Sequence, residues 1–305
     1  MSEIQVRQRT EEWFELRQCV QLTASKFGEA LGVGRGKPYD FFLSLLSDCT
    51  SFESGTGYDN HYTKHGNEME PILNEAYQLL TGNTTQESGF WLPSDSSNLS
   101  GLVGASPDAK VLNKTLSEPV GLVEYKAPVH RMYDLTKKHT HNGIPRNYMA
   151  QMQGQMLICN LPWCDFMATC CQTKDIRLLR VYAQPEYMLH MSSKLHDFCL
   201  TLREARRLKS EGQTFADFPG AANLKSLLLA DSHLPGEDAI VVENLLQTDS
   251  KGRFCSLANF WMDYDFLMGN PSSSGHSEVG IDYQSKLNNI DKEIFSRQEG
   301  YQCLN

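Results

Sequence analysis

Two carboxylates and a lysine in the middle of the sequence could carry out chemistry. Asp108 lies in a Pro-Asp turn. Glu124 and Lys126 lie in the short apolar run Val120 to Ala127, which is typical of a strand in a core. Because side chains alternate across a strand, both ionisable groups of this run face the same side of it. The pattern indicates either an ion pair near the edge of a sheet or a site where these groups act together.

The turn that precedes the strand favours a site. The segment Ser106 to Ala109 separates two apolar pieces, Gly101 to Ala105 and Ala109 to Leu112, and resembles the bend of a hairpin. If the second piece pairs with the strand that carries Glu124, Asp108 comes to lie beside that residue. Two adjacent carboxylates repel each other, and a divalent cation removes the repulsion. Carboxylates with a nearby lysine therefore predict a Mg²⁺ site with a proton-transfer group, which suits phosphodiester hydrolysis.

Composition limits the class of protein. The 305 residues, 40% of them hydrophobic, allow one large domain or one domain with a long appendage. No apolar run reaches the roughly 18 residues of a membrane span, and the first residues have no secretory signal. The nine scattered cysteines suit reduced thiols in an intracellular compartment. The formal net charge of -9 argues against a general polyanion binder, although a local basic groove can exist in an acidic protein.

Two short helices are expected near the N-terminus, joined near Val20 to Leu22. Thr10 is a suitable start for the first helix, and Thr23 or Ser25 can cap the second. A helix that begins at Thr23 presents unpaired backbone N–H groups and a hydroxyl, and Arg17 on the preceding helix can join them. This region is a candidate anion site, and the alternative is a capped helix with a surface arginine.

The region that follows is predicted to contain loops and helices. The Gly-rich stretch Gly32 to Pro38 lacks the spacing of a P-loop, and a helix is expected over Tyr39 to Cys49. Apolar positions in His61 to Thr81 recur with the period of a helix. Because Pro71 is tolerated only near a helix start, the regular helix is expected to begin around Glu70. From that position the Glu70 carboxylate can reach a metal cluster.

The remaining elements alternate between strands and helices, which predicts an α/β protein with a mixed central sheet and helices on both sides. Strands are expected over Gln86 to Leu92, Trp163 to Gln172 and Ile176 to Tyr182, and helices over Pro145 to Cys159 and Pro185 to Lys209. The basic stretch from residue 130 to residue 141 is a candidate for a loop that faces phosphate, and its His139-x-His141 pair is a weaker zinc signal. Beyond residue 212 the pattern weakens to short apolar pieces.

The helix over Pro145 to Cys159 carries a pair of amides. Gln151 and Gln155 are one turn apart and share part of a face. Such a pair can hydrogen-bond a scissile phosphate or a water on a metal ion. The alternative is that both glutamines are exposed to solvent.

Six motifs in this order resemble the lambda exonuclease family, also called YqaJ-type viral recombinase nucleases, of the PD-(D/E)xK superfamily. They are WFELR (Trp13 to Arg17), TAS (Thr23 to Ser25), HGNEME (His65 to Glu70), GASPDA (Gly104 to Ala109), VEYKAP (Val123 to Pro128) and YMAQMQGQM (Tyr148 to Met156). The resemblance covers roughly Arg7 to Glu204. It implies a restriction-endonuclease-like PD-(D/E)xK core in a nuclease domain over residues 1–211, followed by a C-terminal extension over residues 212–305.

The resemblance also implies an activity. It implies an exonuclease that digests one strand of duplex DNA from 5′ to 3′, with Mg²⁺ as the cofactor and Mn²⁺ able to replace it. The implied partners are duplex DNA with a free 5′ end, a single-strand annealing or binding protein, and further copies of the chain in a trimer. The implied location is the nucleus or wherever the DNA of the system resides.

Individual residues receive roles from the same resemblance. Four groups would bind metal: the side chains of Glu70, Asp108 and Glu124 and the backbone carbonyl of Tyr125. Lys126 would orient or deprotonate the attacking water, with its pKa lowered by the metal ions, and Gln151 would assist at the metal or the water. Arg17 and Ser25 would hold the terminal 5′ phosphate. Further nucleic-acid contacts are expected from Thr23, Arg131, Lys137, Lys138 and Gln155.

Two other functions remain open. The first is an endonuclease or an RNA-cleaving enzyme of the same superfamily, which a closed circular substrate would separate from an exonuclease. The second is a nuclease-like module that binds nucleic acid or a protein without cutting. The acidic balance favours this module, but burying a cluster of charges is costly without a function. The hypothesis of an enzyme fails if Asp108 and Glu124 lie on opposite sides of the sheet.

Overall fold

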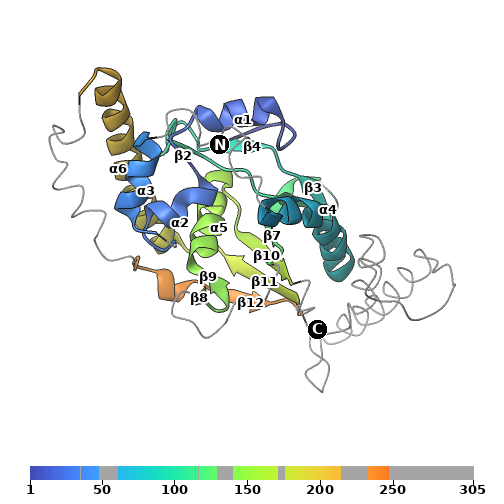
Figure 1. Ribbon diagram of the computed structural model, residues 1–305. Coiled ribbons are helices and arrows are strands. Elements are labelled where there is room, and N and C mark those ends of the chain that lie inside the picture. The colour runs from blue at the N-terminus through green and yellow to red at the C-terminus, as the bar shows by residue number, and fades with distance from the viewer. Residues whose placement is uncertain are drawn as a thin grey trace.

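A six-stranded mixed β-sheet forms the centre of the protein (Figure 1). The computed structural model describes residues 1–34, 36–47, 61–113, 115, 117–128, 140–170, 176–213 and 233–246. The strand order is β12-β11-β10-β7-β6-β3. These strands are β3 (Thr84–Glu87), β6 (Ala109–Leu112), β7 (Pro119–Lys126), β10 (Trp163–Thr169), β11 (Ile176–Tyr182) and β12 (Val242–Asn244). Because β7 and β10 run parallel and the other neighbours antiparallel, the predicted mixed sheet is confirmed.

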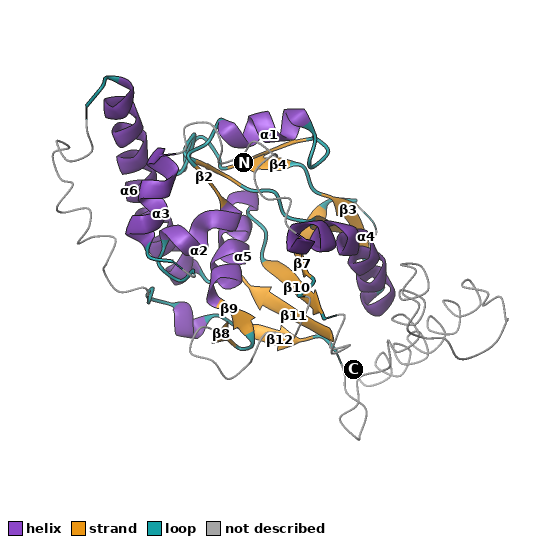
Figure 2. Ribbon diagram, viewed as in Figure 1, coloured by secondary structure: helices purple, strands orange, loops and turns teal. Residues whose placement is uncertain are grey.

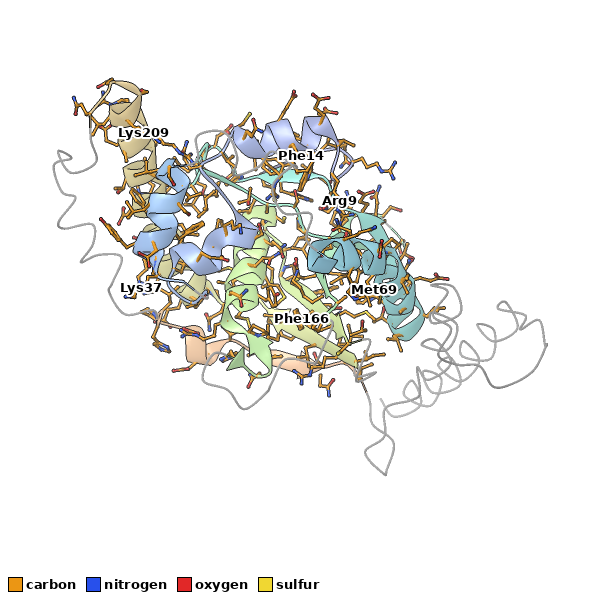
Figure 3. All side chains as sticks on the ribbon, in the orientation of Figure 1. Arg9, Phe14, Lys37, Met69, Phe166 and Lys209 are labelled. Atoms are coloured by element: carbon orange, nitrogen blue, oxygen red, sulfur yellow. The ribbon has the colours of Figure 1, made fainter. Side chains whose placement is uncertain are left out.

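Helices cover both faces of this sheet (Figure 2). On one face, α4 (His61–Thr81) packs Met69 in the same cluster as Val123 of β7. On the other face, α5 (Arg146–Cys159) packs in the cluster that contains Phe166 of β10. Figure 3 labels Met69 and Phe166, one from each core. Since successive residues of a strand face opposite sides, each central strand contributes to both cores.

Two further helices enlarge the core on the α5 side. They are α3 (Pro38–Ser47) and α6 (Pro185–Ser210). The two helices meet through Phe42 and Phe198, whose ring centroids lie 5.6 Å apart in an edge-to-face arrangement. The helices predicted in these places are confirmed, as are the helix that corresponds to α5 and the strand that corresponds to β11.

The N-terminal region confirms one predicted helix and corrects the other. α1 (Glu11–Gln18) begins after Thr10, whose hydroxyl accepts a hydrogen bond from the helix backbone. The second predicted helix is instead a 3₁₀ turn, η1 (Ala24–Lys26), followed by the single turn α2 (Phe27–Ala30). Gly32, with a φ of 80°, ends this turn in the left-handed conformation that stops helices. These turns are too short to provide the helix N-terminus that the sequence suggested.

The helix α4 corrects the prediction that a regular helix begins around Glu70. It is continuous from His61 and contains Pro71 in its interior. Proline inside a helix costs about 3 kcal/mol, because it lacks a backbone N–H and crowds the preceding turn. Met69 precedes this proline and is fully buried. Burial of such a side chain contributes about 1.5–3 kcal/mol, so packing of the first half of α4 on the sheet offsets much of the cost.

Three two-stranded sheets accompany the main sheet in the described ranges. Their strands are β1 (Ser2–Ile4) with β4 (Phe90–Leu92), β2 (Leu22–Thr23) with β5 (Val103–Gly104), and β8 (Thr140–His141) with β9 (Ile144–Pro145). The single strand predicted over Gln86 to Leu92 is therefore wrong, since β3 and β4 belong to different sheets. The chain changes direction at Gly89, where a Cβ would lie 2.2 Å from the carbonyl oxygen of Ile4.

The turn before Asp108 has different partners from those expected. The hairpin predicted between Gly101 to Ala105 and Ala109 to Leu112 is wrong, because β5 pairs with β2, and Ala105 forms a bridge with Trp91. The second predicted pairing is confirmed: β6 runs antiparallel to β7, with Ala109 opposite Val123. This second pairing is the one that positions Asp108.

Residues 233–246 pack on the same core. They form η3 (Glu237–Ala239) and the edge strand β12. Leu234 and Ile240 are buried in the main cluster, and Glu237 forms an ion pair with Arg146 at the start of α5. Part of the predicted C-terminal extension therefore completes the sheet. None of the helices in the described ranges combines the length and apolar character needed to cross a bilayer.

Candidate active site

The hairpin of β6 and β7 brings Asp108 beside the strand that carries Glu124 and Lys126. Asp108 directly precedes β6, and its Oδ2 accepts a hydrogen bond of 2.7 Å from the backbone N–H of Tyr125. Glu124 and Lys126 share a face of β7, and the lysine ammonium donates a hydrogen bond to Glu124 Oε1. Tyr125 and its neighbour Val123 face the α4 side, as the alternation of a strand requires. The three predicted residues thus lie together.

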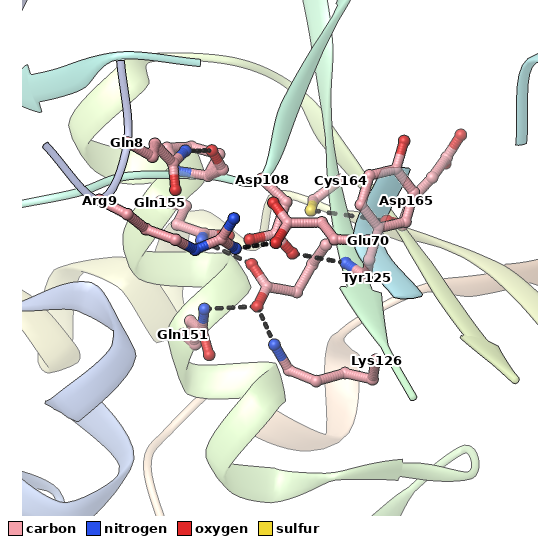
Figure 4. Close-up of polar contacts among 12 residues, drawn as sticks. Gln8, Arg9, Glu70, Asp108, Tyr125, Lys126, Gln151, Gln155, Cys164 and Asp165 are labelled. Atoms are coloured by element: carbon pink, nitrogen blue, oxygen red, sulfur yellow. Dashed lines mark hydrogen bonds and ion pairs between the residues drawn. The ribbon is translucent and has the colours of Figure 1, made fainter. Parts of the chain in front are cut away.

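Glu124 is held by two glutamines of α5, Gln151 and Gln155, which are labelled in Figure 4. Its side chain is 1% exposed. Gln151 Nε2 donates to Glu124 Oε1 at 2.6 Å, and Gln155 Nε2 donates to Oε2 at 2.8 Å. Hydrogen bonds to an ionised carboxylate offset part of the cost of burying it. The predicted common face of the two glutamines is confirmed, and it points at the carboxylate rather than at solvent.

Glu70 joins the cluster from α4. Its Oε2 is paired with the guanidinium of Arg9. Burial raises the pKa of Glu70, Arg9 lowers it, and the Glu124 carboxylate raises it further, with a net rise. Figure 4 shows Glu70 in the same group of charged residues as Asp108 and Lys126, and the Glu70 carboxylate contributes to raising the pKa of Asp108.

The carboxylates of this cluster repel one another. Burial raises the pKa of Asp108 well above its ordinary value, and the Glu124 and Glu70 carboxylates raise it further. Burial alone would lower the pKa of Lys126, but Glu124 and Asp108 outweigh burial and raise it. The lowering of this pKa that was predicted with metal ions bound is not tested by the protein without them, and it stays a prediction. That prediction assumed cations as neighbours, whereas the charges nearest to Lys126 are carboxylates.

The donor atoms of the cluster fit a hard divalent cation. In the described residues no group of three or more His, Cys, Asp or Glu side chains is arranged to hold a metal ion. Glu124 is hydrogen-bonded to its neighbours, and Glu70 is paired with Arg9. Besides burial, the Glu124 carboxylate raises the pKa of both Glu70 and Asp108, so these two groups favour an added positive charge. Gln155 Oε1, beside Glu124, is buried without a hydrogen-bond partner. Carboxylate and carbonyl oxygens are the ligands that Mg²⁺ prefers.

A second polar cluster lies between α1 and η1. Arg17 donates to Thr23 Oγ1 at 3.1 Å, and this hydroxyl is 3.2 Å from Ser25 Oγ. Because the Thr23 hydroxyl makes these contacts, it does not cap the following turn. Arg17 also lies over the ring of Trp13, 4.3 Å from its centroid. The structure brings together the three residues expected to contact phosphate in this region.

Side chains of the N-terminal segment connect the two clusters. Trp13 Nε1 donates to Ser106 Oγ at 2.9 Å, and Gln8 Nε2 donates to the carbonyl oxygen of Pro107 at 2.8 Å. Both acceptors lie in the turn that leads to Asp108. Together with Arg9, these residues anchor the turn and Glu70 to the segment that begins α1.

Sequence reasoning missed Arg9, Gln8 and the contact of Tyr148 with Lys126. Lys126 Nζ lies 5.0 Å from the centroid of the Tyr148 ring, a cation–π distance. Tyr148 belongs to the motif that contains Gln151, so its place in that motif was an available signal. Nothing in the sequence marks Arg9, because its role depends on an unusual backbone conformation. Three predicted nucleic-acid contacts, Arg131, Lys137 and Lys138, lie outside the described residues.

Comparison with known proteins identifies the domain. Residues 12–162 match the family described as the YqaJ-like viral recombinase domain. The alkaline exonuclease LHK-Exo from Laribacter hongkongensis has a TM-score of 0.51 at 23% identity, over 70% of this chain and 100% of its own. The structure of LHK-Exo in complex with dAMP gives a TM-score of 0.53 at 22% identity over the same shares. No curated protein sequence matches the chain.

These comparisons agree with the architecture described above. The likeness to LHK-Exo concerns the fold, and it agrees with the predicted mixed central sheet flanked by helices. The family match spans α1, the turn that carries Asp108, the strand β7 and the glutamines of α5. Residues 12–162 therefore form a YqaJ-like viral recombinase domain.

Proposed function

We propose that this protein is a Mg²⁺-dependent nuclease that hydrolyses one strand of duplex DNA from a 5′ end. The observation that carries the proposal is the convergence of Asp108, Glu124 and Lys126 at the β6–β7 hairpin. The family match and the fold shared with an exonuclease support this chemistry.

The carboxylates of Glu70, Asp108 and Glu124, with the backbone carbonyl of Tyr125, would hold the metal, and Mn²⁺ would replace Mg²⁺. When bound, a divalent cation acts as a Lewis acid on the scissile phosphate and stabilises charge on the departing oxygen. Gln151 and Gln155 hold both oxygens of Glu124 in place. We assign these two glutamines to the positioning of Glu124, and the Oε1 of Gln155 is buried without a hydrogen-bond partner.

Lys126 is the candidate for the residue that acts on the attacking water, either by orienting it or by accepting its proton. Its carboxylate neighbours raise its pKa, so its amine carries a proton at neutral pH in the protein without cations. In this form the ammonium orients the water and stabilises the negative charge that develops on the phosphate. It could act as a base only when the charges of Glu124 and Asp108 are neutralised.

The cluster of Arg17, Thr23 and Ser25 would bind the terminal 5′ phosphate. A guanidinium with two hydroxyl groups offers several donors to one phosphate. Trp13 and Gln8 tie this cluster to the turn that leads to Asp108. A phosphate bound there would lie at a set position relative to the carboxylates, which suits removal of nucleotides from a 5′ end. Assembly into a trimer and association with an annealing protein remain predictions from the family.

The test uses four substrates with Mg²⁺: 5′-phosphorylated duplex, 5′-hydroxyl duplex, closed circular duplex and end-labelled RNA. We expect nucleotides to be released fastest from the 5′-phosphorylated duplex, with the circle left intact. Asp108→Asn should abolish release, whereas Asp95→Asn, which changes an exposed loop residue, should not. Cleavage of the circle would show an endonuclease, preferential release from RNA would show a ribonuclease, and binding without cleavage would show a non-catalytic module.

A further inference from the structure

Arg9 has a backbone conformation that is uncommon for its residue type. Its φ is 66°, in the left-handed region that residues other than glycine seldom adopt. Such a conformation persists only where the surroundings impose it, and it is found most often at functional sites. The contacts of the residues before and after Arg9 should therefore explain this conformation.

The residues on both sides of Arg9 are anchored. Gln8 Nε2 donates to the carbonyl oxygens of Ser88 and Pro107, at 2.9 Å and 2.8 Å. Thr10 Oγ1 donates to the carbonyl oxygen of Arg7 at 2.8 Å, and Thr10 also caps α1. These contacts fix the chain before and after Arg9. The left-handed conformation is thus imposed, and it directs the side chain to the carboxylate cluster.

The guanidinium of Arg9 is paired with Glu70 and remains accessible. Figure 4 shows this ion pair. The Arg9 side chain is 44% exposed, and that of Glu70 is 20% exposed. The pair includes Glu70 Oε2, an atom of a carboxylate that the proposed function assigns to a metal. A divalent cation on Glu70 would repel the guanidinium, since like charges within a few ångström destabilise each other. A half-exposed arginine can leave without breaking the packing of a core.

We propose that Arg9 is a displaceable counter-ion for Glu70, which it exchanges for a DNA backbone phosphate when a divalent cation binds to the carboxylates. This inference rests on the proposed function. The guanidinium neutralises Glu70 in the absence of cations. When it is displaced, its planar donors suit a phosphate oxygen pair. Binding of the cation and binding of DNA are then linked through one side chain, which acts as a positioning residue.

The test compares Arg9→Asn with Arg7→Asn in the full chain. Asparagine is neutral and tolerates the left-handed conformation, and Arg7→Asn removes the same charge two residues away. Titration of Ca²⁺ without DNA, followed by calorimetry, should show about fivefold tighter binding by Arg9→Asn, because loss of a competing partly exposed ion pair has an effect of this order. Arg7→Asn should bind Ca²⁺ as the wild type does.

The second measurement is the affinity for 5′-phosphorylated duplex. With Ca²⁺ present, Arg9→Asn should bind this duplex roughly fivefold to tenfold more weakly, and the slope of log affinity against log salt should fall by about one phosphate contact. With chelator in place of Ca²⁺, Arg9→Asn should bind the duplex as the wild type does. The cation dependence of the loss distinguishes an exchange from a simple phosphate contact.

Three results would overturn the inference while leaving the proposed function intact: unchanged Ca²⁺ affinity, an equal loss of DNA affinity with and without Ca²⁺, or no difference from Arg7→Asn. A wild type that binds no divalent cation would overturn both. If thermal melting shows that Arg9→Asn is unfolded, Arg9→Gly provides the same test, since glycine adopts a positive φ without strain.

Discussion

Two buried carboxylate clusters lie on opposite faces of neighbouring strands, and their charges balance differently. Asp165 of β10 is opposite Val123 of β7, so it faces away from Glu124. Its oxygens accept hydrogen bonds from Tyr77 at 2.6 Å and from Arg180 at 2.7 Å and 2.9 Å. Arg180 in turn lies 3.7 Å from the centroid of the Trp163 ring. This cluster pairs one negative charge with one positive charge.

The cluster around Glu124 lacks this balance. Three carboxylates, those of Glu70, Asp108 and Glu124, share the cationic groups of Arg9 and Lys126. Burial, and then the neighbouring carboxylates, raise the pKa of Glu70 and of Asp108. Neutral, saturated pairs suit a structural role, whereas an unbalanced cluster favours an external cation. The comparison separates a carboxylate that supports the fold from those that support chemistry.

Asp108→Asn should have the largest effect in the comparison. It keeps the shape of the side chain and an acceptor for the Tyr125 N–H but removes a proposed metal ligand. We expect cleavage to fall by at least about a thousandfold, as for loss of a group that stabilises developing charge. The free energy of unfolding should be unchanged or higher, because one of several repelling carboxylates is gone. A large loss of stability would show that Asp108 resembles Asp165.

Asp165→Asn should have the reverse profile. Loss of one partner of a buried ion pair costs about 3–5 kcal/mol, and the value should lie near the lower limit because Arg180 is partly solvated, with 21% of its side chain exposed. Denaturant unfolding measures this loss. The folded fraction should cleave DNA at the rate of the wild type, and a specific loss of cleavage would contradict the assignment of this cluster to the fold.

The pH dependence of cation binding should also separate the clusters. The pKa of Asp108 is higher in the folded protein than its ordinary value of 3.8. At a pH between these two values, the folded protein binds a proton at this carboxylate that the unfolded chain does not bind. As pH rises, this carboxylate becomes charged and destabilises the folded protein. As pH falls, protons compete with the metal ion for the carboxylate. Calorimetry should show Ca²⁺ affinity falling as pH is lowered towards the acidic range. Asp108→Asn should reduce this dependence.

Substitution of two glutamines of α5, Gln155 and Gln153, should give the smallest difference in activity between the two kinds of site. Gln155 contacts Glu124, whereas Gln153 donates to the carbonyl oxygen of Tyr182 at 2.8 Å and accepts from the backbone N–H of Gln184 at 3.0 Å. Gln155→Ala should lower kcat by about tenfold, the lower range for loss of a residue that orients a ligand. Gln153→Ala should cost about 1–3 kcal/mol of stability with unchanged kcat. Equal effects on kcat would remove the distinction.

Most of the cluster around Glu124 could be predicted from the sequence, but little of the cluster around Asp165 could be. Alternation along one strand is a local rule, and it placed Glu124 and Lys126 on one face correctly. The periodicity of a helix likewise placed Gln151 and Gln155 on one face. Tyr77 and Asp165 are 88 residues apart, and no local sequence pattern predicts their contact.

Other features escaped prediction because tertiary contacts override local preference. Pro71 does not begin the regular part of α4, since the packing of Met69 extends the helix before it. Gly89 divides a predicted strand because the backbone of Ile4 approaches it closely. The left-handed φ of Arg9 depends on anchors at residues 8 and 10, one of which bonds to residues 88 and 107. None of these causes can be seen within a window of neighbouring residues.

The edge strand β12 has a practical consequence for anyone who shortens this chain. A fragment that ends at residue 211 would lose the strand that covers β11, together with Glu237, the partner of Arg146. The bare N–H and C=O groups of β11 could then template strand addition by another copy. Poor solubility of such a fragment would reflect an uncovered sheet margin, and a fragment meant for crystallisation should extend through residue 246.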